Sequence, residues 1–324
     1  MRATSDTRAT LPGSRETSAR PDAITLACFA ALVLVAGGNP VGVRFSNREL
    51  APFWGAGLRF GVASILLLAL ARARRLALPR GRALAGTLLF GFLACFAFFA
   101  LVYVAFTHVP ASLGAPNFAS MPLLTFFFAL AHRLEPFRWR GLIGASASVA
   151  GIAVLSSAGG SSSAPIKYLL LILAASACAA EASIVVKKFP KVHPIMMNAI
   201  GMLMSSMLFL AISFTRSEAH TLPHRRAGWL ALGYLVLFGS CVTFLLIVTV
   251  INRLTATASS YYFVLFPIVS VLLAAWIAKE PLTASIASGG ALVLIGVYIG
   301  ALSGRHHAHH GKKPAVEPAP CPSC

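Results

Sequence analysis

Long apolar runs separated by short polar gaps occupy most of the chain between residues 23 and 302. A helix needs about 20 predominantly apolar residues to cross the hydrocarbon core of a bilayer. Backbone groups in lipid must find their hydrogen-bond partners within the protein, so runs of this length predict helices. Ten membrane-spanning helices are predicted, at residues 23–43, 52–71, 84–106, 110–131, 141–157, 168–186, 195–214, 227–250, 255–277 and 283–302.

The composition agrees with this pattern and excludes a water-soluble domain. Of the 324 residues, 57% are hydrophobic and 11% are charged, with a mean hydropathy of +0.79. A soluble domain averages about 25% charged residues. Lipid must therefore be the solvent for much of the surface, and the predicted fold is an all-α, polytopic membrane protein whose main partner is the lipid bilayer.

The net charge of +18 does not indicate a nucleic-acid partner, because the basic residues lie in the gaps between apolar runs. With the N-terminus inside, 19 of the 27 Lys and Arg residues fall in inner segments and 7 in outer gaps. Basic residues concentrate on the cytoplasmic side of a membrane. We therefore expect a multi-pass protein of the inner (plasma) membrane with both termini in the cytoplasm, each carried on a disordered tail, residues 1–22 and 303–324.

The C-terminal tail combines histidines with a Cys-x-x-Cys pair, which are residue types that bind zinc. The histidines at positions 306–310 and the cysteines at 321 and 324 match the spacing of no closed structural site. The tail is also rich in Pro, Ala and Lys, as disordered segments are. The sequence predicts no metal site and no cofactor.

The two halves of the chain share a pattern at a constant offset of 145 residues. The matching positions are Pro122, Glu135-Pro136, Gly144 and Gly151 in the first half and Pro267, Glu280-Pro281, Gly289 and Gly296 in the second. We predict two five-helix repeats, residues 23–157 and 168–302, joined by a Gly/Ser-rich linker at 158–167. Because five is odd, the second repeat must be inverted in the membrane. Secondary transporters with inverted repeats bind their substrate near the midplane, between the two copies.

These motifs resemble the EamA-type ten-helix exporters of the drug/metabolite transporter superfamily. The resemblance is carried by Gly38-Asn39-Pro40, by Leu58-Arg59-Phe60 and by the two Pro to Glu-Pro stretches, and it covers residues 23–302. It implies a helical bundle with a central cavity, alternating access, and export of small metabolites or amino acids. One departure is Gly37-Gly38-Asn39, where relatives commonly carry Trp-Gly before the Asn.

Two charged residues lie inside the predicted spans, and a charge at that depth needs a partner or a wet cavity. Arg59 either faces the cavity and attracts an anionic substrate group, or extends toward headgroups and helix carbonyls in a structural role. Glu181 lies about 8 Å from the inner end of its helix at about 1.5 Å per residue. It is a candidate for proton coupling, and the alternatives are a salt bridge to Lys187 or Lys188 and extension of its side chain to the inner interface.

Neutral polar residues complete the predicted cavity. Asn39 lies where Pro40 breaks the first helix, and the repeat places Asn117 opposite Tyr262, each five residues before a proline. Further candidates for substrate binding are Tyr103, Asn198, Thr243 and Ser260. Pro40, Pro122 and Pro267 are the predicted helix breaks or hinges. For each polar residue the alternative is an interhelical hydrogen bond without a substrate role.

The pattern favours a secondary transporter that exports a small molecule, with proton coupling as an open question. An intramembrane enzyme is disfavoured because no span holds two carboxylates and the histidines lie in loops or at interfaces. A phosphate-binding loop of the ATPase type is absent from the sequence. A passive channel or a membrane protein without transport activity is the alternative, and both a monomer and a homodimer remain open.

Overall fold

The computed structural model describes residues 22–110, 114–134, 166–254 and 256–277, with single residues beyond them. Within these ranges, seven segments are helical, long and apolar enough to cross a membrane, and Met121–Ala131 is a shorter apolar helix. The predicted spans at 141–157 and 283–302, most of the linker and nearly all of the two tails lie outside the described segments. The predicted count of ten helices is therefore not tested in full.

The elements follow the predicted spans closely, with several spans built from two or three helical pieces. In chain order they are α1 (Ala23–Gly37), α2 (Asn39–Ser46), α3 (Pro52–Ala73), α4 (Arg82–Phe90), η1 (Gly91–Ala97), α5 (Phe98–Phe106), η2 (Ala115–Ser120), α7 (Met121–Ala131), α9 (Ile166–Lys188), α10 (Pro194–Thr215), α11 (Arg226–Val236), η3 (Leu237–Val242), α12 (Thr243–Arg253), α13 (Ala256–Ser260) and α14 (Tyr262–Ile277).

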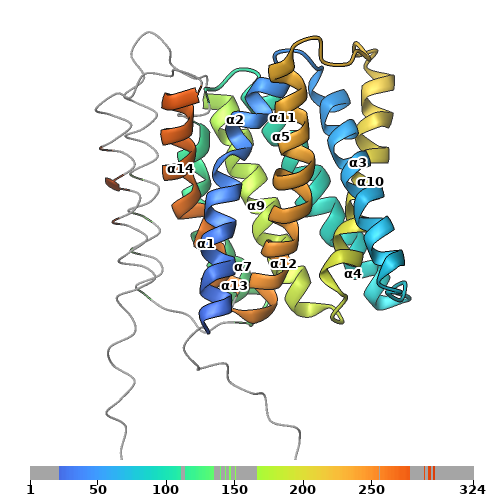
Figure 1. Cartoon of the computed structure of the whole chain (residues 1–324). Coiled ribbons are helices and arrows are strands. Elements are labelled where there is room, and N and C mark those ends of the chain that lie inside the picture. The colour runs from blue at the N-terminus through green and yellow to red at the C-terminus, as the bar shows by residue number, and fades with distance from the viewer. Residues whose placement is uncertain are drawn as a thin grey trace, which may run out of the picture.

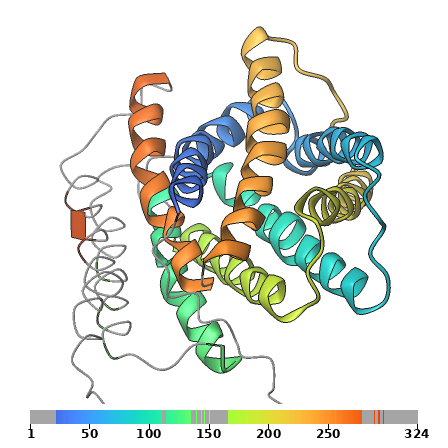
Figure 2. The ribbon, with the colours of Figure 1, turned by 60° about the horizontal axis from the view of Figure 1, so that its bottom comes forward.

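Helices of the two halves alternate around the bundle (Figures 1 and 2). Each neighbouring pair in this ring is in contact, and the order is α14, α1, α11–α12, α3, α10, α4–α5, α9, α7 and back to α14. Neither half therefore forms a closed bundle by itself within the described residues. The space at the centre of the ring is surrounded by helices from both halves.

The third span of each half contains a π-helical segment at its middle. η1 and η3 begin and end at positions about 145 residues apart, so the distortion follows the repeat. A π-helical turn widens the helix and changes which carbonyls are available for bonding. Ser205 of α10 donates to the Gly91 carbonyl of η1 at 3.1 Å, and Arg59 of α3 donates to the Gly239 carbonyl of η3 at 2.8 Å. Each π-helix is thus held by the second span of the opposite half.

Small residues allow these spans to approach closely. A Cβ atom at Gly201 would lie 2.9 Å from the Gly91 Cα atom, so the two backbones are in direct contact. Close approach through Gly and Ser is the usual means of helix association in lipid. Ser206 of α10 also donates to the Gly57 carbonyl of α3 at 2.9 Å. These contacts fix α3 and α10 against each other and against η1.

Two loop carboxylates accept from backbone N–H groups at, or just before, the start of helices in the opposite half. Glu49 of the first half accepts from the backbone of His224 and Arg225 at the start of α11, at 2.8 and 3.0 Å. Glu218 of the second half accepts from the backbone of Trp54 near the start of α3, at 2.9 Å. Helix starts carry unpaired N–H groups and favour negative charge. Each half therefore supplies one carboxylate to the start of a helix in the other half.

We expect Glu49→Gln to destabilise the protein at neutral pH but not in acid. The N–H of Arg225, and then that of His224, hold the pKa of Glu49 below its ordinary value of 4.5. A lowered pKa in the folded state gives stability that is present above the unfolded pKa and is lost as the pH falls through the folded one. The melting temperature of the detergent-purified protein should fall at pH 7, and its difference from the wild type should shrink as the pH is lowered below 4.5. A difference that stays constant as the pH falls would instead indicate lost packing.

Candidate functional site

A pocket lies between the two halves of the bundle. Its empty space is about 820 Å³, counting the open solvent at its mouth. Eleven of its lining residues come from α1 to η2 and twelve from α9 to α14. The pocket therefore lies at the interface between the halves, where inverted repeats are expected to enclose a substrate.

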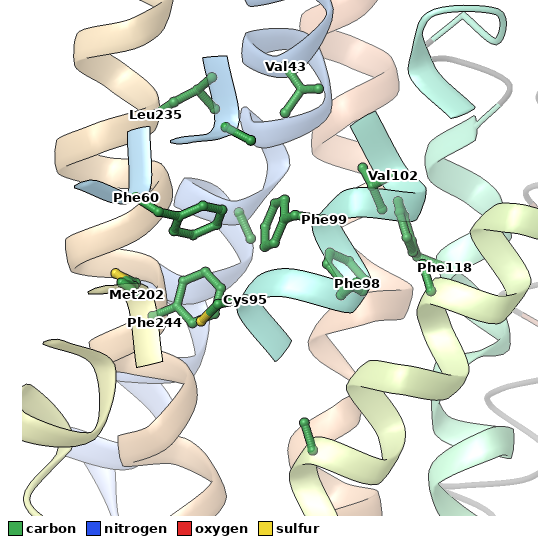
Figure 3. Packing of buried hydrophobic residues seen from close by; sticks show 14 of the residues in the cluster. Val43, Phe60, Cys95, Phe98, Phe99, Val102, Phe118, Met202, Leu235 and Phe244 are labelled. Carbon is green, nitrogen blue, oxygen red and sulfur yellow. The ribbon is translucent and has the colours of Figure 1, made fainter. Parts of the chain in front are cut away.

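Aromatic side chains make up nine of the 23 residues that line the pocket. Figure 3 shows part of this wall, with Phe98 beside Phe118 and with Phe99 between Phe60 and Phe98. The ring centroids of Phe98 and Phe118 are 5.5 Å apart, which is a normal spacing for paired aromatic rings. The phenylalanines that line the pocket are Phe90, Phe98, Phe99, Phe106, Phe118, Phe244, Phe263 and Phe266. Such a wall suits a solute with an apolar or aromatic body.

Four of the predicted cavity residues line this pocket: Asn39, Thr243, Ser260 and Tyr262. The Thr243 hydroxyl donates to the Phe238 carbonyl at 2.8 Å, and the Ser260 hydroxyl to the Thr257 carbonyl at 2.7 Å. Because their hydrogens are engaged, these hydroxyls offer acceptor lone pairs to a bound solute. Asn39 is the lining side chain that carries N–H donors on an amide.

Two lining hydroxyls, Ser183 and Ser259, were not predicted. Both side chains bond to a carbonyl of their own helix, Ser183 to Ala179 at 3.2 Å and Ser259 to Ala256 at 2.7 Å. A serine with such a bond is common in any membrane helix. The sequence around these two serines therefore does not indicate that they face a pocket. The rotation of their helices places them there.

The other four predicted cavity residues lie behind the pocket wall. The Tyr103 side chain is fully buried, and that of Asn117 is nearly so and donates to the Gly114 carbonyl at 3.4 Å. Asn198 donates to the carbonyls of Pro194 and Phe244, at 3.0 and 3.1 Å, and so joins α10 to a residue of the wall. The fourth is Arg59.

Arg59 is completely buried between α3 and η3. Its Nε donates to the Ser240 hydroxyl at 2.7 Å, and its Nη2 to the Gly239 carbonyl at 2.8 Å. The guanidinium carbon lies 4.7 Å from the ring centroid of Phe99 and 5.1 Å from that of Phe60, within the range of cation–π attraction. These contacts hold the guanidinium inside the bundle and away from the headgroups, and the bond to the Gly239 carbonyl is of the kind that the structural alternative expects.

Glu181 lies outside the pocket, at the end of the bundle where α1 begins. Its carboxylate contacts His132 Nε2 at 2.8 Å, and His132 Nδ1 contacts Lys188 Nζ at 2.9 Å. The direct salt bridge to Lys187 or Lys188 that the sequence offered is thus replaced by a bridge through an imidazole. Lys187 donates instead to the Leu254 carbonyl, just before α13. This chain of contacts links α9 to the end of α7.

His132 reaches Glu181 because α7 ends in a tight turn. His132 caps the helix, and Arg133 follows with a positive φ of 56°. The Leu134 N–H bonds back to the Ala129 carbonyl at 2.8 Å, which closes the turn as in a Schellman motif. Glycine usually occupies the left-handed position, so the sequence carried no sign of this turn.

Helix breaks lie next to two of the three predicted prolines, Pro40 and Pro122, whereas the helix continues through Pro267. Gly38 separates α1 from α2, and Pro40 follows in the first turn of α2 and lines the pocket. Pro122 differs from the expectation of an interrupted helix, because it lies in the first turn of α7, after the 3₁₀ segment η2. Pro267 lies inside α14. Prolines at first turns are favourable, since that N–H has no helical partner.

The sequence is similar to a transporter family and to curated proteins. The profile of the EamA-like transporter family matches residues 23–157 and again residues 166–301. The chain is 30% identical over 256 residues to the protein named "Uncharacterized inner membrane transporter YedA" of Escherichia coli strain K12. The same identity is found with YedA of strains O6:H1 and O157:H7. Each match covers 78% of this chain and 82% of the relative.

The fold is also similar to a solved crystal structure of a protein. The two superpose with a TM-score of 0.69 over 87% of this chain and 98% of the other. Their sequences are 20% identical, so this similarity concerns the fold alone.

Proposed function

The chain belongs to the EamA-like transporter family, and on that premise we propose that it is a secondary transporter that exports a small metabolite or amino acid by alternating access. The pocket between the two halves carries the proposal, because both halves supply its wall. A solute held there would be released to either side when the halves rock against each other. Asn39, Thr243, Ser260 and Tyr262 are the proposed solute contacts.

The helix irregularities support alternating access. The break at Gly38, the π-helices η1 and η3, and the turn at Tyr261 all adjoin residues that line the pocket. Irregular backbone at membrane depth is tolerated where it lines a cavity or is buried in protein. A change in hydrogen-bond register at these points would let one half of a span tilt while the other half stays packed.

Proton exchange is the proposed driving force, with Glu181 as the proton carrier. The carboxyl group contacts an imidazole that in turn contacts Lys188, so a change in its protonation would alter bonds between α9 and α7. The relatives named YedA are inner membrane transporters. We place this chain in the same membrane, with both termini in the cytoplasm, so the Glu181 cluster lies at the cytoplasmic end.

Transport by the purified full chain in lipid vesicles tests the proposal. A panel of labelled amino acids and small organic acids should include a compound whose uptake saturates with concentration. Vesicles preloaded with that compound unlabelled should accumulate the label transiently, because a carrier exchanges solute faster than it returns empty. Flux that rises linearly with concentration, without counterflow, would instead show a passive channel.

A further inference from the structure

The charge on Arg59 has no carboxylate partner in the described part of the protein. Four acidic residues are described there, and each has other partners. Asp22 contacts Thr25 and Arg253, Glu49 and Glu218 bind helix starts, and Glu181 contacts His132. A buried guanidinium without a negative partner is unfavourable in a membrane protein, and such groups commonly mark substrate or ion pathways.

Two polar atoms at this place, one on Arg59 and one on Asn39, also have no hydrogen-bond partner among the described residues. Nη1 of Arg59 and Oδ1 of Asn39 are both buried and make no hydrogen bond among the described residues. Both side chains converge on Gly239, where an added Cβ would collide with Asn39 Oδ1 and lie 3.1 Å from Arg59 Nη2. Buried polar atoms are rarely unsatisfied, and an unoccupied ligand or water position is a common reason.

We propose that Arg59 and Asn39 form an anion subsite next to the pocket, with Asn39 in the pocket wall and Arg59 buried behind it, which binds a carboxylate or a similar anionic group of the solute. This inference rests on the proposed function and names its substrate class. Ser240 and Gly239 hold Nε and Nη2, so Nη1 remains for the ligand. The Asn39 side chain lies both beside Arg59 and in the pocket wall. Its unpartnered Oδ1 is an acceptor, so the subsite requires the amide group to turn about its own axis and present its N–H groups to the anion.

The rest of the pocket selects the body of the solute. Phe99 stacks on the Arg59 guanidinium and also lines the pocket, so the anion subsite and the aromatic wall are continuous. A charge-assisted hydrogen bond is stronger where water is excluded. The expected substrates are therefore small organic anions with an apolar or aromatic body, including aromatic amino acids and their acylated derivatives.

A matched pair of probes tests the subsite by titration calorimetry on the detergent-purified full chain. N-acetylphenylalanine carries a carboxylate, and N-acetylphenylalaninamide replaces it with a neutral amide of similar shape. The wild type should bind the acid about tenfold more tightly, as charge-assisted hydrogen bonds allow. Arg59→Gln should bring the ratio of the two dissociation constants to about one. Arg48→Gln removes the same charge from an exposed residue and should leave the ratio unchanged.

Conservative variants protect the test against loss of the fold. Arg59→Lys keeps the charge and should retain a preference for the acid, although a reduced one, because Lys cannot hold the same fork of contacts. Asn39→Asp keeps the shape of the side chain and places a carboxylate beside Arg59. It should weaken binding of the acid about tenfold and leave binding of the amide unchanged.

The subsite is excluded if the wild type binds the acid no more tightly than the amide. It is also excluded if Arg59→Gln leaves the preference for the acid intact. Should Arg59→Gln not fold, Asn39→Asp takes its place, and an intact preference in that variant excludes the subsite. Counterflow in vesicles separates this failure from failure of the proposed function. Equal exchange of both probes would exclude the subsite and leave the transporter in place. Discrimination in binding without any counterflow would support the subsite and exclude transport.

Discussion

Ala179→Phe is expected to reduce saturable transport at least about tenfold without unfolding the protein, since the new ring has empty space to enter. Ala179 lies on α9, is half-buried and lines the pocket. A phenyl ring built there projects into the space that the solute needs, and the surrounding helices need not move. The measurement is the initial rate of counterflow in vesicles, with the melting temperature in detergent as the check on folding.

Ala174→Phe provides the matched control. Ala174 is on the same helix but is exposed on the outside of the bundle. The same added ring would lie among lipid chains, so transport should remain at the wild-type rate. If Ala179→Phe transports as fast as Ala174→Phe, the pocket between the halves is not the transport pathway.

Glu181→Gln is expected to abolish the pH dependence of transport. The glutamine oxygen can still accept from His132, so the contact between α9 and α7 is preserved while the titratable group is removed. In vesicles with a pH gradient, the wild type should accumulate solute against its concentration gradient. The variant should exchange solute for solute but show no response to the pH gradient.

Two further variants test whether the Glu181 carboxyl group is responsible for the pH dependence of transport. Glu181→Asp retains a carboxyl group and should retain pH dependence with a changed midpoint. Glu49→Gln removes a carboxylate from a loop between α2 and α3 and should retain the wild-type pH profile. A Glu181→Gln protein that keeps the wild-type profile would exclude this residue as the proton carrier.

The spans were predictable because the thickness of the bilayer sets their length. Each described span lies within a few residues of its predicted range, since about 20 apolar residues must be helical in lipid. The break at Gly38-Asn39-Pro40 was also predictable, because proline removes a donor and disfavours the helical conformation of the residue before it. The π-helices were not, because residues 91–97 are as apolar as the regular helix around them.

The site was harder to predict, because the rotation of each helix decides which side chains meet. Asn39, Thr243, Ser260 and Tyr262 face the pocket, while Asn117 and Asn198, which are just as polar, are buried behind it. The contact between His132 and Glu181 joins residues 49 positions apart, through an imidazole just beyond a helix end. Local sequence carries no information on such a pairing, and it depends on how α7 and α9 pack.

The reciprocal capping by Glu49 and Glu218 has a consequence for how the chain tolerates being cut. If the peptide were severed between residues 157 and 166, each fragment would keep a helix whose leading amides had lost their carboxylate acceptor, and a carboxylate that had lost the backbone donors of the other fragment. Association of the two fragments would restore both sets of carboxylate-to-backbone hydrogen bonds at once, together with the alternating order of the helices in the ring. Fragments produced separately in one cell should therefore be unstable alone and reassemble as a pair.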